Sequence, residues 1–206
     1  TPSNIDSFTI KGLIGRGGMG HVYKGFDTNL DREIAIKVMH PSRAKDEVSK
    51  KRFLRESKTA ASINHPSIVT IYQIGEHNKL PYIAMHLIDG PNLSEYRAQQ
   101  GGLIPIPEAV RIGREISEGL AAAHEKGLVH RDIKPDNILL EGPNRHVQII
   151  DFGLAHETGD NEGRLTLDNA VIGTPAYMSP ERIGTDEVNA KSDLFGLGVI
   201  LYEIVS

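Results

Sequence analysis

The sequence predicts an α+β protein with two lobes: a small antiparallel sheet carrying one helix, followed by a mainly helical part. Three observations predict this architecture. Apolar and polar residues alternate with a period of two in the first third of the chain, a helical period dominates afterwards, and Gly90-Pro91 lies near the change. A chain of 206 residues is long enough for two small lobes that share a cleft.

Five runs in the first third show the alternation expected of strands, with Gly, Asn and Asp turn signals between them. These runs are Phe8–Leu13, His21–Phe26, Glu33–Met39, Ile68–Ile74 and Pro81–Leu87. One helical stretch interrupts them between Asp46 and Ile63, where Phe53 and Ala60 lie on an apolar stripe. The first third is therefore expected to form a small sheet with one helix.

The remainder of the chain is predicted to be largely helical. Its clearest helix is Glu108–Lys126, which has one apolar stripe and a stop signal at Gly127. Two short apolar runs, Ile138–Leu140 and Val147–Ile150, flank a Gly-Pro-Asn turn and predict a hairpin set into the helical lobe.

The composition is that of an ordinary globular protein. A charged fraction of 24% and a net charge of -4 lack the basic excess typical of nucleic-acid binding, so we expect no nucleic-acid partner. The absence of cysteine excludes disulfides and cysteine-ligated zinc, and it fits a reducing compartment.

The longest apolar stretch, Leu194–Val205, is too short to span a bilayer and contains Glu203. We therefore expect a core helix, no membrane contact in this segment, and a cytoplasmic location. Because Thr1 is not an initiator methionine, the segment is expected to come from a longer protein, in which an anchor elsewhere is compatible with these residues.

A glycine-rich stretch, Gly15-Arg16-Gly17-Gly18-Met19-Gly20, matches the pattern G-x-G-x-x-G. Glycines in this pattern let backbone N–H groups approach phosphates without obstruction from Cβ atoms. A ligand-free turn and a dinucleotide-binding loop are alternatives. The dinucleotide version runs straight into a helix, whereas His21–Phe26 alternates as a strand. The pattern therefore favours a phosphate lid between two antiparallel strands.

A lysine and a glutamate are predicted to form an ion pair. Lys37 shares a strand face with the small apolar Ala35, and Glu56 lies on the apolar stripe of its helix, three residues after Phe53. A buried carboxylate must find a cation. The alternative is an exposed lysine and a solvated glutamate. Their order after the glycine-rich stretch favours a pair in which Lys37 holds phosphate oxygens and Glu56 holds Lys37.

Three further motifs carry a family resemblance. They are His130-Arg131-Asp132-Ile133-Lys134-Pro135-Asp136-Asn137, then Asp151-Phe152-Gly153, then Gly173-Thr174-Pro175-Ala176-Tyr177-Met178-Ser179-Pro180-Glu181. With them the chain resembles the eukaryotic-type protein kinase family from Phe8 to its C-terminus. The stretches 18–23 and 177–181 are most similar to those of bacterial receptor-type Ser/Thr kinases.

The resemblance implies a protein-kinase-like fold with a truncated helical lobe. Residues 1–7 would be a leader, residues 8–87 the N-lobe, and residues 88–206 an incomplete C-lobe with the activation segment at 151–181. Because family members continue for several helices, we expect Glu181 to lack its usual arginine partner. We also expect self-association through the apolar residues Leu197, Ile200, Leu201 and Ile204.

By resemblance, the chain transfers the γ-phosphoryl group of ATP to serine or threonine hydroxyls of proteins, including itself. Asp132 would accept or orient the hydroxyl proton, and Lys134 would neutralise charge on the transferring group. Asn137 and Asp151 would hold Mg²⁺, with Mn²⁺ as an alternative. Lys134 and Thr174 indicate serine/threonine rather than tyrosine specificity.

The resemblance also implies a nucleotide site. Val22, Ala35 and Leu139 would enclose the adenine faces, and the backbone around His86 would meet the adenine edge, although His86 replaces the acidic residue common there. The residues expected to contact the nucleotide are Ile14, Gly15, Arg16, Gly17, Gly18, Met19, Gly20, His21, Val22, Ala35, Lys37, Met85, Leu87 and Leu139.

Regulation and support of the catalytic loop follow from the same resemblance. Thr166 is the expected regulatory phosphosite, Asp168 stands where related kinases often carry a second threonine, and Arg131 is expected to receive the phosphate. His130 is expected to pack and hydrogen bond rather than to act as a base. Asp193 is expected to accept hydrogen bonds from catalytic-loop N–H groups.

Two other function classes compete with a kinase. A pseudokinase or nucleotide-binding scaffold shares the fold, but every polar residue that phosphoryl transfer requires is present. A dinucleotide-dependent oxidoreductase is disfavoured by the strand that follows the glycine-rich stretch.

Overall fold

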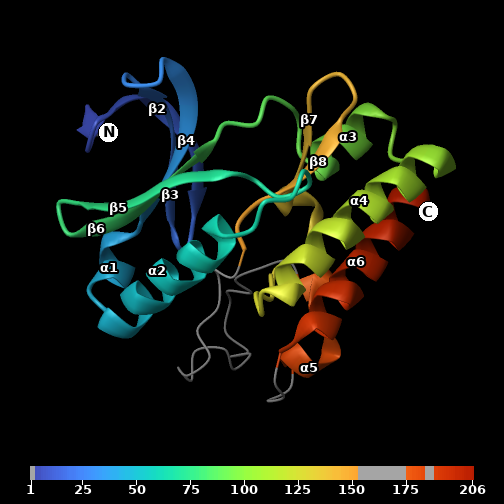
Figure 1. Ribbon diagram of the computed structural model, residues 1–206. Helices are drawn as coiled ribbons and strands as arrows, with labels where there is room; N and C mark the ends of the chain where they lie inside the picture. The colour runs from blue at the N-terminus through green and yellow to red at the C-terminus, as the bar shows by residue number, and fades with distance from the viewer. Residues whose placement is uncertain (1–2, 153–174, 184–187) are drawn as a thin grey trace, which may run out of the picture.

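The computed structural model describes residues 3–152, 175–183 and 188–206. Strands dominate its first part and helices its second part, and the chain passes from one to the other after β6 (Figure 1). The predicted two-lobed α+β architecture is therefore confirmed.

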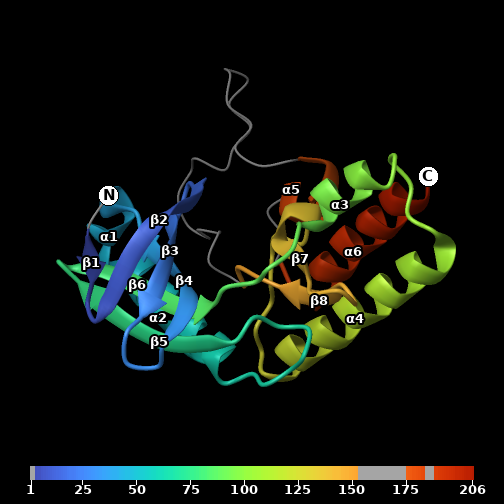
Figure 2. The ribbon, with the colours of Figure 1, turned by 90° about the horizontal axis from the view of Figure 1, so that it is seen from above.

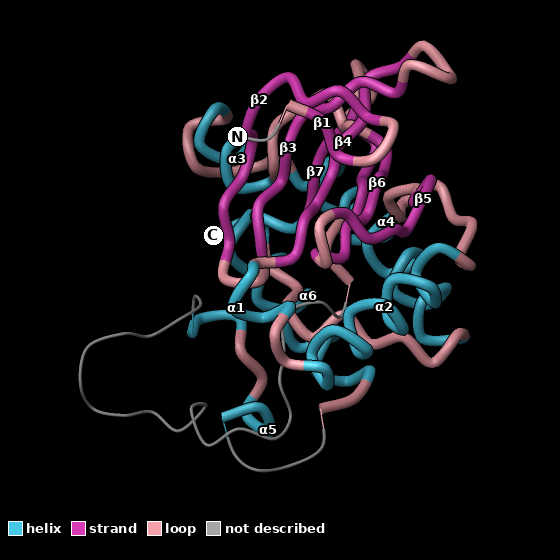
Figure 3. The backbone as a smooth tube through the Cα atoms, turned by 90° about the vertical axis from the view of Figure 1, so that its left-hand side faces the viewer, coloured by secondary structure: helices cyan, strands magenta, loops and turns pink. Residues whose placement is uncertain are grey.

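The N-terminal lobe is built on one antiparallel sheet with the strand order β1-β2-β3-β4-β6-β5 (Figure 3). Its strands are β1 (Asn4–Ile5), β2 (Phe8–Gly17), β3 (Gly20–Asp27), β4 (Arg32–Met39), β5 (Ile71–His77) and β6 (Leu80–His86). All five predicted strands are present, although β5 begins three residues later than predicted. Strand β1 has two residues and is too short to show a period.

Strand β4 is buried on both faces, which explains its nearly continuous apolar sequence. One face packs with Phe8 and Tyr82, and the other places Met39 against Phe53 of helix α2 (Glu47–Ala61). Helix α2 begins where the Asp46 carboxylate accepts hydrogen bonds from the N–H groups of its first turn. Helix α1 (Pro41–Ala44) connects β4 to α2. The lysine side of β4 therefore faces α2.

The helical lobe contains the larger hydrophobic core. Its elements are α3 (Leu93–Gln99), α4 (Ile106–Glu125), η1 (Pro135–Asn137), the hairpin of β7 (Ile138–Glu141) and β8 (His146–Ile149), η3 (Pro175–Tyr177), α5 (Pro180–Ile183) and α6 (Ala190–Val205). Helices α4 and α6 lie side by side in both ribbon views (Figures 1 and 2). Helix α3 was not predicted because its seven residues give little periodicity, although Asn92 and Glu95 form a capping box.

The prediction of which face of α6 is available for self-association is wrong. Leu197 is 6% exposed and Ile200 is fully buried, because both pack into the core. The apolar residues that α6 exposes are Leu194, Phe195, Tyr202 and Val205. A helix that is apolar nearly all round does not reveal from its sequence which face its neighbour covers. Among the described residues, no helix combines the length and apolar character needed to span a bilayer.

Gly20 has a packing reason to be glycine. It pairs with Met39 in the register of β3 and β4, and a Cβ atom at Gly20 would lie 1.9 Å from the carbonyl oxygen of Val38. That contact is with backbone, which cannot rotate away.

We predict that Gly20→Ala lowers the free energy of unfolding by about 1–3 kcal/mol, the usual effect of forcing extra atoms into a packed site. Chemical denaturation measures this difference. The control is Gly12→Ala on β2, where an added Cβ meets no described atom within 4 Å. Equal stability of the two variants would contradict the packing role of Gly20.

Candidate active site

The glycine-rich stretch forms the turn between β2 and β3, as predicted, with Gly17 paired to Gly20. An added Cβ at Gly15 or Gly17 would meet no described atom nearer than 3.5 Å, and at Gly18 none within 4 Å. The backbone there is open to a ligand, so the turn fits the approach of phosphate groups.

Apolar side chains gather below this turn. Ala35 and Met85 are buried in one cluster, and Val22 and Leu87 pack against it. Four of the residues predicted to contact the nucleotide thus come together from three strands and the segment after β6. Leu139 does not belong to this cluster. It is half-buried on β7 between two fully buried neighbours, so its side chain lies on the strand face opposite to theirs.

The crossing between the lobes is tied by His86, at the end of β6. Its N–H donates to the carbonyl oxygen of Thr70 at 2.9 Å, and its ring contacts Glu141 of β7 and the Tyr72 hydroxyl. The sequence showed His86 only as a departure from an acidic residue. The structure shows that it links the sheet to the hairpin of the helical lobe.

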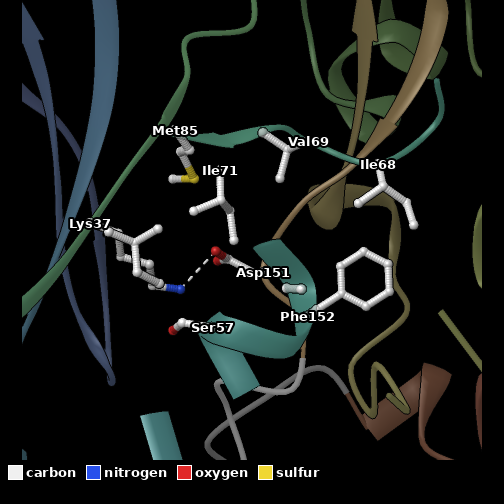
Figure 4. Close-up of a pocket in the computed structure, with 10 residues that line it drawn as sticks. Lys37, Ser57, Ile68, Val69, Ile71, Met85, Asp151 and Phe152 are labelled. Carbon is white, nitrogen blue, oxygen red and sulfur yellow. Dashed lines mark ion pairs between the residues drawn. The ribbon is translucent and has the colours of Figure 1, made fainter. Parts of the chain in front are cut away.

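Lys37 points across the cleft to Asp151 (Figure 4). Its Nζ lies 2.7 Å from Asp151 Oδ1, and the lysine is 6% exposed. The pocket around this ion pair is lined on its apolar side by Ile71, Met85 and Phe152. The structure therefore places both predicted residues in one pocket, with the lysine buried and the aspartate partly exposed.

The predicted Lys37–Glu56 pair is absent from the described structure. Glu56 Oε1 instead accepts a hydrogen bond from Arg131 Nη1 at 2.9 Å. Arg131, expected to await a regulatory phosphate, therefore already has a carboxylate partner. The sequence correctly predicted that Glu56 is buried and needs a cation. It could not choose between two cations, one of which lies 75 residues away in the catalytic loop.

Burial raises the pKa of Glu56, and the Arg131 guanidinium only partly offsets this effect. The second carboxylate oxygen, Oε2, is buried without a hydrogen-bond partner among the described residues. A buried oxygen in this state is costly, so Glu56 is held in place by a single described donor.

Asp132 lies among cations. Lys134 Nζ is 2.8 Å from Asp132 Oδ2, and Asn137 Nδ2 donates to the same oxygen at 3.2 Å. The structure thus brings these three predicted residues together. Arg182, which the sequence analysis missed, lies on the other side, with Nη1 3.9 Å from Asp132 Oδ1. Its only sequence signal was its place next to the Ser-Pro-Glu stretch.

The two predicted metal ligands lie on backbone segments that are hydrogen bonded to each other. The N–H of Ile150 donates to the carbonyl oxygen of Asn137 at 3.0 Å, which brings the neighbouring Asp151 close. Asn137 Nδ2 also donates to the Asp132 carbonyl oxygen at 2.7 Å, so the amide oxygen is the group left for a metal. A carboxylate and an amide oxygen suit Mg²⁺, which takes its other ligands from water and phosphates. These residues therefore fit the metal.

The catalytic loop rests on Asp193, as predicted. This carboxylate, 1% exposed, accepts hydrogen bonds from the N–H groups of His130 at 2.8 Å and Arg131 at 2.7 Å. It also contacts His124 Nε2 at 2.8 Å, a partner that the sequence did not reveal.

His130 has the supporting role that was predicted for it. It is fully buried, and burial lowers its pKa, which favours the neutral ring. Its Nε2 lies 2.8 Å from the carbonyl oxygen of Ile150, and its Nδ1 accepts from the N–H of Asp132 at 3.2 Å. A neutral ring that donates at Nε2 and accepts at Nδ1 satisfies both contacts.

Three residues to which the sequence analysis assigned roles, Thr166, Asp168 and Thr174, lie outside the described residues. Glu181, which was expected to lack its usual arginine partner, accepts a hydrogen bond at Oε1 from Ser192 Oγ. That hydrogen bond is the main reason that the pKa of Glu181 is lowered, and Lys191 adds to it.

Comparisons with a protein-family model and with known proteins point to the same family. The protein-family model "Protein kinase domain" matches residues 8–206. The serine/threonine-protein kinase PknB of Mycobacterium tuberculosis is 37% identical over 211 residues, covering 100% of this chain and 33% of PknB. The probable serine/threonine-protein kinase SCO3848 of Streptomyces coelicolor is 40% identical over 198 residues, covering 94% of this chain and 29% of the relative. The chain thus spans about a third of the length of these curated relatives.

Solved structures agree with the sequence relatives. The crystal structure of the Mycobacterium tuberculosis PknI kinase domain matches with a TM-score of 0.80 and 26% sequence identity. The match covers 99% of this chain and 77% of the PknI chain.

The raised pKa of Glu56 predicts a pH dependence of stability. A carboxyl group whose pKa is higher in the folded state stabilises the fold at low pH, and this contribution is lost as the pH rises through the folded-state pKa. We therefore expect the stability of the parent, relative to Glu56→Gln, to fall as the pH rises above about 4.3, the usual pKa of a glutamate. Denaturation over a pH series measures it.

Glu115 is the matched control with the opposite sign. Burial acts to raise its pKa, but hydrogen bonds from the Val147 N–H and Arg111 outweigh burial and leave the pKa lowered. Its stabilising contribution is lost as the pH falls. Parent-minus-variant slopes of the same sign for Glu56→Gln and Glu115→Gln would contradict this assignment.

Proposed function

Because the chain belongs to the protein kinase family, we propose that it transfers the γ-phosphoryl group of ATP to serine or threonine hydroxyls of proteins, its own included. One observation carries the proposal. Asp132, Lys134 and Asn137 form a connected polar cluster, and Asp151 lies beside it at the end of β8 with Lys37 attached. Phosphoryl transfer depends mainly on such positioning and on charge neutralisation.

The nucleotide is proposed to lie between the lobes. The apolar cluster around Ala35 and Met85 supports the base, and the open backbone of the turn after β2 approaches the phosphates. Lys37 holds phosphate oxygens. Asn137 and Asp151 hold Mg²⁺, which supplies neutralisation of the phosphate charge.

Asp132 is proposed to receive the substrate. The acceptor hydroxyl oxygen forms a bond to the γ-phosphorus while the bond from that phosphorus to the ADP oxygen breaks. The hydroxyl proton passes to the Asp132 carboxylate. Lys134, 2.8 Å from Asp132 in the described structure, neutralises charge on the transferring group.

The described ion pairs are proposed to be a resting set. Lys37 neutralises Asp151, which is the proposed metal ligand, and Arg131 holds Glu56. Asp151 would also hold the metal ion, whose positive charge would neutralise that carboxylate in place of Lys37. Lys37 would then pair with Glu56, and this pair is proposed for the productive state.

A pseudokinase or nucleotide-binding scaffold is the alternative function. It would keep the nucleotide contacts without transfer. The position of Asp132 beside Lys134 and Asn137 favours an enzyme, because a scaffold has no need to orient a carboxylate toward an acceptor. We place the domain in the cytoplasm, where ATP is supplied, and this location is a proposal as well.

We predict that Asp132→Asn lowers the rate of transfer by about 10²- to 10⁴-fold, because an amide cannot accept the hydroxyl proton. The assay measures the transfer of label from γ-labelled ATP, with magnesium, to a generic basic protein.

In the same assay, Lys37→Met is expected to abolish transfer while the fold is retained, since the methionine keeps the stem and removes the charge.

Asp136→Asn is the matched control, because Asp136 is exposed in the same loop and has no proposed role in transfer. It should retain the parental rate. Label transfer that persists at the parental rate in Asp132→Asn would contradict the proposal.

Thr166 is proposed as the regulatory phosphosite, although it lies outside the described residues. A phosphate adds a charge of about −1.5 to −2, which would compete with Glu56 for Arg131. We predict that mass mapping of the autophosphorylated protein finds phosphate on Thr166, and that Thr166→Ala lacks this modification. Phosphate found only at other positions would contradict this assignment.

A further inference from the structure

The segment that follows β6 is bound to the helical lobe, where it runs beside β7 (Figure 2). The N–H of Leu140 donates to the carbonyl oxygen of Pro91 at 2.9 Å, and the N–H of Gly142 donates to that of Asp89 at 3.2 Å. Gly90 lies so close to β7 that an added Cβ atom would be 1.9 Å from the Leu140 carbonyl oxygen. This part of the segment therefore moves with the β7–β8 hairpin.

The chain also passes between the lobes at a second place, just before β5. The Val69 N–H donates to the Ile149 carbonyl oxygen at 3.1 Å, and the Ile149 N–H donates to the Ser67 carbonyl oxygen at 2.8 Å, so this stretch lies against β8. The next residue, Thr70, accepts a hydrogen bond from the His86 N–H at 2.9 Å, so the two passages lie side by side. The lobes can therefore turn about an axis that runs through Thr70 and the two residues after His86.

The side chain of His86 joins the two lobes at this axis. Its Nε2 contacts Oε1 of Glu141, the last residue of β7, and its Nδ1 lies 3.2 Å from the hydroxyl of Tyr72 on β5. A neutral ring that donates at Nε2 and accepts at Nδ1 satisfies both partners. The guanidinium of Arg32 lies over the Tyr72 ring, 3.5 Å from its centroid, and so supports the second partner. The His86 and Glu141 side chains are 35% and 28% exposed, so their contact is partly shielded from water.

The ion pairs Lys37–Asp151 and Arg131–Glu56 also join the lobes. Both are proposed to be exchanged when nucleotide and metal bind, so they cannot hold the lobes at one angle throughout binding. Neither side chain of the pair beside the axis has a proposed contact with nucleotide or metal. That pair can therefore persist while the other two change.

We infer that His86 and Glu141 are positioning residues that set the angle between the lobes and preorganise the nucleotide site. This inference rests on the proposed function, in which the base lies against the apolar cluster of the N-terminal lobe while Asn137 and Asp151 of the helical lobe hold the metal. A nucleotide with its metal must contact both lobes at once. An angle that is fixed in advance reduces the freedom lost on binding and so strengthens binding.

The test measures the dissociation constants of the full chain for two ligands, adenosine and a non-hydrolysable ATP analogue with Mg²⁺. Only the second ligand carries phosphates and a metal for the helical lobe. We expect His86→Ala and Glu141→Ala each to raise the Kd of the analogue about fivefold, the usual net effect of one lost hydrogen bond. The Kd of adenosine should change by less than about twofold, because adenosine does not depend on the angle at which the metal ligands are held.

A double variant tests whether the two residues act through their contact. His86→Ala combined with Glu141→Ala should raise the Kd of the analogue no further than either single substitution, since each one already removes the contact. The control is Glu33→Ala, which removes an ion pair with Lys24 that lies within the sheet, with Lys24 Nζ 2.8 Å from Glu33 Oε1. It should keep both parental constants. Melting temperatures are measured for all variants.

Three results overturn the inference alone: analogue binding that the single variants leave unchanged, equal weakening of adenosine and analogue, and full additivity in the double variant. Equal weakening would mean a distorted pocket and not a changed angle. If the alanine variants do not fold, Glu141→Gln, which keeps the size and removes the charge, decides by the same two constants. A parent that binds neither ligand overturns the proposed function and this inference with it. A parent that binds both ligands but transfers no phosphate overturns the kinase proposal alone.

Discussion

The catalytic loop depends on one buried carboxylate, that of Asp193. Arg131 has a φ of 69°, a left-handed conformation that is unfavourable for residues with a side chain. Hydrogen bonds from the N–H groups of His130 and Arg131 to Asp193 hold this conformation. Because the loop is fixed there, Arg131 can reach Glu56 while Asp132 stays beside Lys134. The positions of the residues proposed to carry out the chemistry thus depend on a side chain in the N-terminal turn of α6.

Charge neutralisation then explains how the rest of the site is arranged. Glu56 and Lys37 are both nearly inaccessible to water, and in such surroundings an unpaired charge is costly. In the described structure each functional carboxylate pairs with a cation of the chain itself: Glu56 with Arg131, Asp151 with Lys37 and Asp132 with Lys134. In the proposed mechanism the charges of nucleotide, metal and peptide would replace these internal pairs, so binding and rearrangement would be coupled by the same few ion pairs.

The sequence predicted what depends on local periodicity and on fixed spacing. Strands β2 to β6, helices α2 and α4, the β7–β8 hairpin and the support from Asp193 were all predicted. The partner of Glu56 was predicted incorrectly, because burial requires a cation without specifying which one, and the choice depends on where α2 lies relative to the catalytic loop. Arg182 was missed because a single arginine after a motif has no pattern of its own. The exposed face of α6 was also mispredicted, since its neighbours are set by tertiary packing.

The exchange of ion pairs can be tested directly. We would determine the crystal structure of the protein with a non-hydrolysable ATP analogue and Mg²⁺, using a preparation shown to transfer phosphate. The account predicts that Lys37 Nζ leaves Asp151 for Glu56 and the phosphates, and that Arg131 leaves Glu56. A nucleotide-bound, active protein in which Glu56 remains on Arg131 and Lys37 remains on Asp151 would contradict it.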